Sequence, residues 1–152
     1  MNSRKKIKLH LAYIIFLLLL GMIFWLSAQN GDKSHDMSQK ICISIVTCFN
    51  EQGNLELTEK QLSKFCVYLD GPIRKLAHFT EYAVLGLVLT RIVPYYVNER
   101  WKRILIVLGV LAGIGIIDEV HQLFIIARNG KLQDVIVDVL GGSIGMLFVL
   151  KK

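Results

Sequence analysis

The sequence GIIDEVHQLF, Gly115–Phe124, decides the fold. An apolar run of membrane-helix character ends there in two carboxylates, an imidazole and a carboxamide, carried by Asp118, Glu119, His121 and Gln122. Ionisable groups are costly at membrane depth, so they usually face a protein interior or a water-filled cavity. The stretch is therefore either a helix end at the water interface or one wall of a functional site.

The composition indicates a membrane protein. The chain has 152 residues, enough for one domain, and we treat 1–152 as a single unit. A hydrophobic content of 53% and a mean hydropathy of +0.48 exclude a disordered chain and are typical of membrane proteins. The three cysteines, Cys42, Cys48 and Cys66, form no C-x-x-C motif. We expect them to be unpaired and to act as small apolar residues.

Four apolar runs are long enough to cross a bilayer, which takes about 20 residues in a helix. They cover residues 9–28, 76–97, 104–122 and 135–150. The first could instead be a cleaved signal peptide, because Leu26-Ser27-Ala28 is an acceptable cleavage site. Its length and the interfacial Trp25 favour a retained helix. The sequence thus predicts an all-α fold, an integral membrane four-helix bundle.

Residues 29–71, between the first two spans, form the most polar region of the chain. Apolar residues recur there at helical spacing, first at Met37, Ile41, Ile45, Cys48 and Phe49, then at Leu62, Phe65, Cys66 and Leu69. Thr58 and Gln61 resemble a capping box at the start of the second helix, and Pro72 is expected to end it. We expect two amphipathic helices that lie at the membrane interface or cover the bundle.

The distribution of charge predicts the orientation. If the N-terminus is cytoplasmic, four passes put residues 1–8, the turn at 91–103 and residues 151–152 on the cytoplasmic side. These stretches carry ten of the 18 basic residues, namely Arg4, Lys5, Lys6, Lys8, Arg91, Arg100, Lys102, Arg103, Lys151 and Lys152, with Glu99 as their one acid. Both termini are then cytoplasmic, and the segment 29–71 is extracytoplasmic. Topology explains the net charge of +6, so nucleic-acid binding is not needed to account for it.

With this topology, polar groups of three spanning helices meet at the outer membrane level. The groups are Lys75, His78 and Glu81; Asp118, Glu119, His121 and Gln122; and Arg128, Asp134 and Asp138. Residues three or four apart share a helix face, so each helix contributes a polar stripe. The small-residue motifs Gly141-x-x-x-Gly145 and Gly109-x-x-x-Gly113 predict close helix packing, and the first favours an Asp138 that points into the bundle.

The candidate acid and base groups are Glu119, His121, Glu81 and His78. The candidate substrate-binding residues are Lys75, Gln122, Arg128, Asp134 and Asp138, and Arg74 could also hold a phosphate or carboxylate. No spacing matches a zinc signature, so no metal and no cofactor is expected. Two other interpretations stay open: Asp118 can be a solvated helix end, and the charged set can serve only to hold helices together.

Three motifs resemble the VanZ-like family. They are Lys75-x-x-His78-Phe79-x-Glu81-Tyr82-x-x-Leu85-Gly86, Asp118-Glu119-x-x-Gln122-x-Phe124-x-x-x-Arg128-x5-Asp134, and Asp138-x-x-Gly141-x-x-x-Gly145. The end of the first span, residues 25–29, is similar to the Ser/Gln-rich exit of that family. The resemblance implies a small membrane protein of a bacterial cell envelope. It also implies a link to resistance against the glycopeptide teicoplanin, the phenotype of the member that names the family.

The residues and the resemblance together predict a protein that acts on the cell envelope and influences glycopeptide susceptibility. One alternative is a membrane-embedded hydrolase or transferase acting from the outer leaflet on a phosphate-bearing lipid or lipid-linked envelope precursor. Another is a non-catalytic binding or assembly module. The expected partners are membrane lipids and such a precursor or a glycopeptide-related target.

Overall fold

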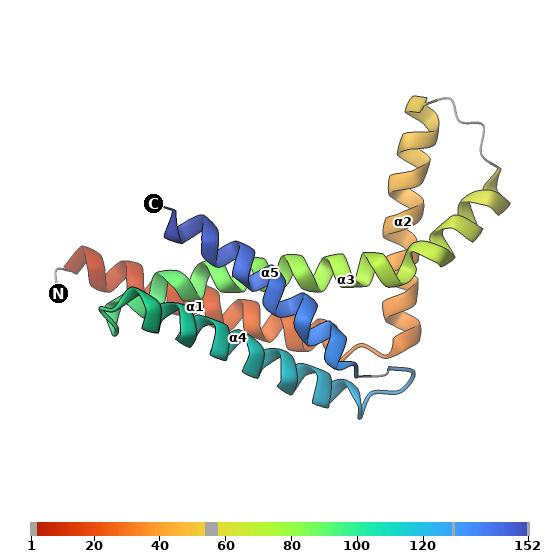
Figure 1. The fold of residues 1–152 in the computed structure, drawn as a ribbon. Helices are drawn as coiled ribbons and strands as arrows, with labels where there is room; N and C mark the ends of the chain where they lie inside the picture. The colour runs from red at the N-terminus through yellow and green to blue at the C-terminus, as the bar shows by residue number, and fades with distance from the viewer. Residues whose placement is uncertain (1–2, 54–57, 129, 152) are drawn as a thin grey trace.

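The computed structural model describes residues 3–53, 58–128 and 130–151 of the chain, and these residues are mainly helical. The elements in order are α1 (Ser3–Ser27), α2 (Gly31–Gly53), α3 (Glu59–Ile92), the 3-10 helix η1 (Val93–Tyr95), α4 (Arg100–Gln122) and α5 (Leu132–Leu150). Figure 1 shows α1, α4, α5 and most of α3 packed lengthwise, with α2 standing across them at one end.

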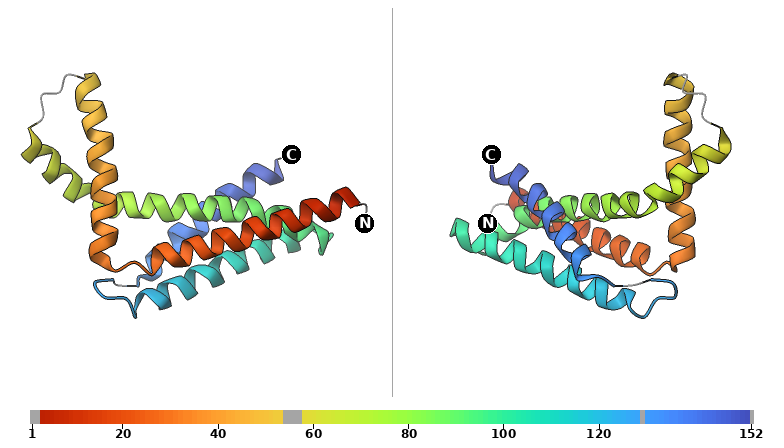
Figure 2. Two further views of the ribbon diagram at one scale, coloured as in Figure 1. Left: turned by 180° about the vertical axis from the view of Figure 1, so that it is seen from behind. Right: turned by 45° about the vertical axis from the view of Figure 1, so that its right-hand side comes forward.

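Four helices are long and apolar enough to cross a membrane: Ser3–Ser27, Lys60–Tyr95, Arg100–Gln122 and Leu132–Leu150. Large apolar side chains such as Leu18, Leu105 and Phe148 lie exposed along them, as expected for surfaces that face lipid. The predicted fold class, an all-α bundle with four helices of membrane length, is confirmed among the described residues. Both chain termini lie at the end of the bundle opposite the α4–α5 loop (Figures 1 and 2).

A core shared by α1, α3, α4 and α5 holds the bundle together. Ile23, Tyr82, Leu85 and Leu111 are completely buried within it, and Met146 of α5 closes it. This burial leaves the polar residues at the ends of α1 and α4 beside one another.

Helix α3 packs most extensively against α5, and glycine makes this possible. A Cβ atom on Gly141 would overlap the carbonyl oxygen of Phe79, and one on Gly145 would overlap that of Ala83. The predicted close approach at this motif is confirmed. The same prediction is wrong for Gly109 and Gly113, which have open space where a Cβ atom would stand because they do not face a neighbouring helix closely.

Pro72 lies inside α3 and does not end it, so the predicted helix stop is wrong. Proline removes one helical hydrogen bond and usually kinks a helix, but packing on both sides can hold the helix together. Before Pro72, Cys66 and Asp70 of α3 contact α2, and after it Phe79 and Ala83 lie against α5. Figure 1 shows the first turns of α3 running in a different direction from the rest. The expected second amphipathic helix is therefore the first part of a helix that enters the bundle. Its start is as predicted: the Thr58 amide donates to Gln61 Oε1 at 2.9 Å.

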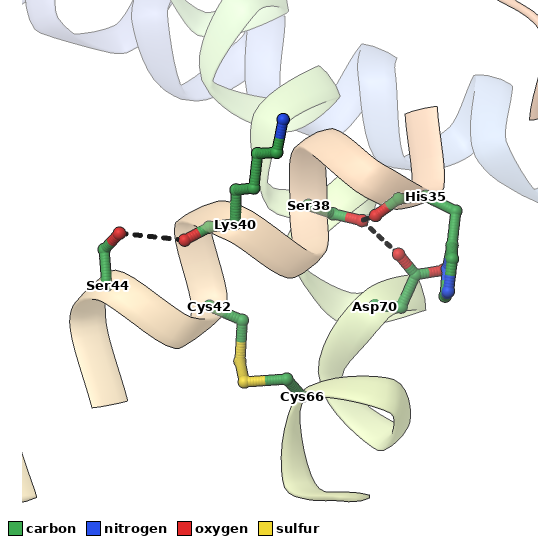
Figure 3. The surroundings of a disulfide bond; sticks show 7 residues. All are labelled: His35, Ser38, Lys40, Cys42, Ser44, Cys66 and Asp70. Carbon is green, nitrogen blue, oxygen red and sulfur yellow. Dashed lines mark hydrogen bonds and ion pairs between the residues drawn. A yellow bond between two sulfur atoms is a disulfide. The ribbon is translucent and has the colours of Figure 1, made fainter. Parts of the chain in front are cut away.

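Residues 31–53 of α2 and residues 59–71 of α3 pair as a two-helix projection, here called the arm. Figure 3 shows the disulfide that joins Cys42 on α2 to Cys66 on α3, with their Cα atoms 5.5 Å apart. The expectation of unpaired cysteines is wrong for these two and correct for Cys48, which is free and exposed. The pairing follows from the antiparallel contact of the two helices, which sequence spacing does not reveal.

Candidate functional site

A buried hydrogen-bond cluster joins the end of α1 to the end of α4. The Ser27 hydroxyl donates to Asp118 Oδ2 at 2.8 Å, and Gln122 Nε2 donates to the same oxygen at 2.9 Å and to Ser27 Oγ at 2.8 Å. Ser27 and Asp118 are both 0% exposed. The interpretation of Asp118 as a solvated helix end is therefore wrong: α1 covers this carboxylate and supplies its hydrogen bond.

Glu119 connects the end of α4 to the beginning of α5 through hydrogen bonds. One of its carboxylate oxygens accepts the backbone N–H of Lys131 at 2.6 Å, and the other lies 3.5 Å from Gln122 Nε2. Both oxygens of Glu119 thus have partners that shape the loop, which favours a structural role over that of a free base.

Arg128, in the α4–α5 loop, is tied to the end of α1. Its Nε–H donates to the Gln29 carbonyl at 3.1 Å and its Nη2 to the Leu26 carbonyl at 3.3 Å. Burial, with a contribution from the nearby Arg74 guanidinium, lowers the pKa of Arg128 below its ordinary value. Arginine stays charged even so. Among the described residues no carboxylate lies within ion-pair distance of this guanidinium.

A cavity of about 220 Å³ opens between α3, the α4–α5 loop and α5. Charged and polar side chains dominate its lining, which consists of Gly71, Arg74, Lys75, His78, Glu119, Gln122, Ala127, Arg128, Lys131, Asp134, Val137 and Asp138. Lys75 Nζ and Asp134 Oδ1 form an ion pair across it at 3.0 Å. Cationic and carboxylate side chains of α3, α4, α5 and the α4–α5 loop therefore line the same cavity.

A smaller cavity of about 80 Å³ lies on the other side of Arg74, His78 and Arg128. The rest of its lining comes from the end of α1, from α2 and from α3: Leu26, Gln29, Ser34, Met37, Ser38, Ile73, Ala77 and Glu81. The two cavities thus share a wall made of two guanidinium groups and an imidazole.

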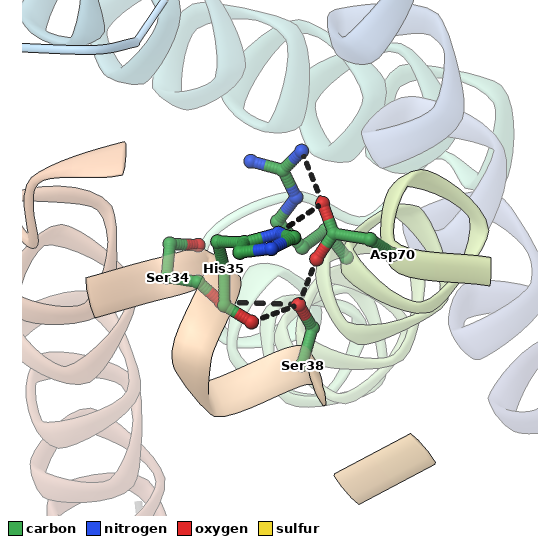
Figure 4. A network of polar contacts seen from close by, with 5 residues as sticks. Ser34, His35, Ser38 and Asp70 are labelled. Atoms are coloured by element: carbon green, nitrogen blue, oxygen red, sulfur yellow. Dashed lines mark hydrogen bonds and ion pairs between the residues drawn. The ribbon is translucent and has the colours of Figure 1, made fainter. Parts of the chain in front are cut away.

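The arm holds Arg74 at this shared wall. Asp70 pairs with Arg74 Nη2 at 2.9 Å and with His35 Nδ1 at 3.2 Å, and it accepts a hydrogen bond from the Ser38 hydroxyl. Figure 4 shows His35 and Ser38 of α2 converging on Asp70 of α3. Cys42 and Cys66 lie one turn further out on the same two helices. The disulfide, the Asp70 cluster and Arg74 therefore follow one another along α3 towards the cavities.

Several buried polar atoms at the site have no hydrogen-bond partner among the described residues of the protein. They are His78 Nδ1, Glu81 Oε2, Tyr82 OH, Asp118 Oδ1 and both carboxylate oxygens of Asp138. Asp138 is 1% exposed and points into the bundle, as its position above Gly141 suggested. Buried polar groups without a protein partner are costly, so a ligand or ordered water that reaches them gains from the contact.

The structure brings together most of the candidate residues. Seven of them line the larger cavity: Lys75, His78, Glu119, Gln122, Arg128, Asp134 and Asp138. Glu81 lines the smaller cavity, while His121 lines neither and faces the ring of Phe24, with ring centroids 6.3 Å apart. Sequence reasoning missed Ser27 as a partner of Asp118. The one feature of the sequence that pointed to Ser27 was its position in residues 25–29, which are similar to the Ser/Gln-rich exit of the VanZ-like family.

A metal centre receives no support from the geometry. The described residues contain no group of three or more His, Cys, Asp or Glu side chains arranged to hold a metal ion.

Comparison with known proteins identifies the family. No curated protein and no solved structure matches the chain. The model of the VanZ/LLP1 family matches residues 11–151, which includes most of α1, the other three helices of membrane length from residue 60 on, and every residue that lines the cavities. Because the match covers nearly the whole sequence, this protein belongs to the VanZ/LLP1 family.

Proposed function

We propose that this protein is a cell-membrane protein that acts on the cell envelope. Its larger cavity binds the phosphate-bearing head group of an envelope lipid or lipid-linked precursor at the outer leaflet, and through this binding it modulates glycopeptide susceptibility. The observation that carries the proposal is the convergence of Arg74, Lys75 and Arg128 on one cavity at the end of a membrane-length bundle.

Two observations support the outward orientation of the cavity. Basic residues dominate both termini and the turn between α3 and α4, which the positive-inside rule assigns to the cytoplasm. The arm lies at the other end of the bundle (Figure 1) and contains the Cys42–Cys66 disulfide. Disulfides persist in oxidising compartments outside the cytoplasm. Charge and redox chemistry therefore favour the same topology, with both termini cytoplasmic and the arm outside.

The chemistry of the lining suits a phosphate. Guanidinium groups form paired, charge-assisted hydrogen bonds with phosphate oxygens. Arg128 is anchored by two backbone carbonyls and Arg74 by Asp70, so both side chains are positioned before a ligand arrives. Pre-positioned donors lose little conformational entropy on binding. Lys75, although paired with Asp134, lies in the same opening and adds positive charge.

A second candidate function is hydrolysis or group transfer at that phosphate. It is favoured by His78 and Asp138, which line the larger cavity and have buried polar atoms without a protein partner. In such a reaction one of them would take the proton from a water or acceptor hydroxyl, whose oxygen forms the new bond to phosphorus. The old phosphorus–oxygen bond would break, and the leaving oxygen would be protonated. This geometry favours His78 over His121, which lies outside both cavities.

Deletion of the gene tests the proposal. The deletion strain should change its susceptibility to teicoplanin and to lipoglycopeptides, and the wild-type gene should restore it. Arg128→Gln should fail to restore it at normal protein abundance. Arg91→Gln, which changes an exposed arginine near the other end of α3, is the matched control and should restore it fully. An unchanged susceptibility on deletion would refute the proposed role.

Two further variants separate the candidate functions. Under the enzyme hypothesis, His78→Gln and Asp138→Asn leave abundance normal but reproduce the deletion strain's envelope-lipid profile. If the charged set only holds helices together, these variants lower protein abundance in the membrane instead. Under the binding proposal Arg128→Gln has the larger effect on susceptibility.

A further inference from the structure

The two cavities meet at a single wall. Arg74, His78 and Arg128 are the residues that line both of them. These are also groups that can donate hydrogen bonds to an anion. An anionic group held at this wall would therefore be in contact with both spaces at once.

The two spaces differ in chemical character. The larger cavity contains the Lys75–Asp134 ion pair and the Glu119 carboxylate. The smaller cavity has an apolar contribution from each of three helices, made by Leu26 of α1, Met37 of α2, and Ile73 and Ala77 of α3. A ligand that fills both must be polar on one side of its anionic group and apolar on the other.

Both arginines at the wall retain donors for a ligand. A guanidinium carries five N–H donors. Arg128 donates from Nε and Nη2 to the carbonyls of Gln29 and Leu26, and Arg74 pairs through Nη2 with Asp70. The remaining donors belong to two like charges held near one another in a half-buried place. An anion between them would relieve that repulsion.

We propose that the lipid phosphate of the proposed function spans both cavities. Its phosphate sits at the wall of Arg74, His78 and Arg128, and its head group extends into the larger cavity. The first apolar carbons of its chain enter the smaller cavity beside Met37, Ile73 and Ala77. This inference rests on the proposed function and specifies how its lipid ligand lies, because a free phosphate or a water-soluble phosphate ester would leave the apolar space unused.

A chain-length series tests the inference. The full-length protein in nanodiscs is titrated with methyl, butyl and hexyl phosphate, with inorganic phosphate as the free-anion probe and empty nanodiscs as the correction for partitioning. Affinity should rise roughly fourfold for each methylene group buried, and it should level off once the smaller cavity is full. Equal affinities for methyl and hexyl phosphate would overturn the inference.

Variants of the smaller cavity make the test specific. Ala77→Phe should flatten the chain-length series, so that hexyl phosphate binds no more tightly than methyl phosphate. Ile73→Trp should do the same, so a folding defect of one variant does not decide the result. Leu76→Phe is the matched control, because Leu76 neighbours Ala77 on α3, is exposed and lines neither cavity. A chain-length dependence that survives both cavity variants would overturn the inference.

The same titrations separate the two proposals. If no phosphate binds and Arg128→Gln changes nothing, the proposed function fails together with the inference. If all phosphates bind through Arg128 regardless of chain length, the head-group binding of the proposed function stands and the placement of the lipid chain in the smaller cavity fails.

Discussion

The hydroxyl of Ser27, the last residue of α1, donates a hydrogen bond of 2.8 Å to the carboxylate of Asp118, which is 91 positions further along the chain. Neither side chain is exposed to solvent. The bond closes the bundle at the end that carries the cavities, because it joins α1 to the helix that presents Glu119 and Gln122. Asp118 therefore receives a hydrogen bond from a residue that is distant in the sequence.

Replacing Ser27 by alanine should destabilise the protein. Asp118 Oδ2 would keep its bond to Gln122, but a buried carboxylate would lose one donor, which costs about 1–3 kcal/mol. Thermal unfolding of the purified protein in detergent should show a lower midpoint. Ser44→Ala is the control, because the exposed Ser44 hydroxyl bonds only to a carbonyl of its own helix. Equal midpoints for the two variants would contradict the importance of the Ser27–Asp118 contact.

Gly145→Ala should weaken the packing of α3 on α5. The added Cβ atom would overlap the carbonyl oxygen of Ala83, and relieving such overpacking costs about 1–3 kcal/mol. Gly21→Ala is the matched control on α1, where no atom lies within 4 Å of the new Cβ. Because alanine favours helix more than glycine does, by up to about 1 kcal/mol, this control should be neutral or stabilising. Unfolding midpoints that rise in both variants would refute the close approach of the two backbones.

Reduction of the Cys42–Cys66 disulfide should loosen the arm more than the bundle. A disulfide contributes about 2–4 kcal/mol to the structure it closes. Brief trypsin treatment should therefore cut at Lys60 or Lys64 faster after reduction, while cleavage inside α1, α4 and α5 stays slow. Cys42→Ser should mimic reduction, and Cys48→Ser, which removes the free thiol, should not. Resistance of the reduced arm to trypsin would show that the disulfide does not hold it.

Asp70→Asn should weaken phosphate binding without unfolding the chain. The amide keeps the shape of the side chain but removes the negative charge that holds Arg74 at 2.9 Å. Since Arg74 is 40% exposed, solvent screening limits the effect, and we expect an affinity loss of about twofold to tenfold that shrinks at high salt. Asp32→Asn, an exposed carboxylate at the start of α2, is the control. A loss of affinity that is unaffected by salt would argue against a role through charge.

Cys48 should report on which side of the membrane the arm lies. In intact cells a membrane-impermeant maleimide should label this exposed thiol, because the proposed topology puts the arm outside. In the background of Cys48→Ser, a Lys151→Cys variant should be labelled only after the membrane is permeabilised. The reverse pattern would invert the proposed topology.

The spanning helices were predictable because burial in lipid requires long apolar runs, and such runs are visible in any single sequence. Residues 104–122, for example, were expected as a span and are contained in α4, Arg100–Gln122. The packing motif at Gly141 and Gly145 was also recognisable. The motif at Gly109 and Gly113 looked the same but faces open space, because spacing alone does not say which helix face has a neighbour.

The candidate site was predictable as a set of residues but not as an arrangement. Helical spacing grouped Lys75 with His78, and the cavity contains both. It did not reveal that Arg74 is held by Asp70 or that His121 turns towards Phe24. These facts depend on contacts between helices distant in sequence. The passage of α3 through Pro72 was missed for the same reason, since packing on both sides holds together a helix that proline alone would interrupt.

Because α3 continues through Pro72, one helix contributes residues both to the arm and to the lining of the cavities. Its outer part carries Cys66 and Asp70, and its inner part carries His78 and Glu81, with no loop between them to absorb a displacement. A change in the position of the arm would therefore be transmitted through one continuous helix to Arg74 and His78, which line both cavities.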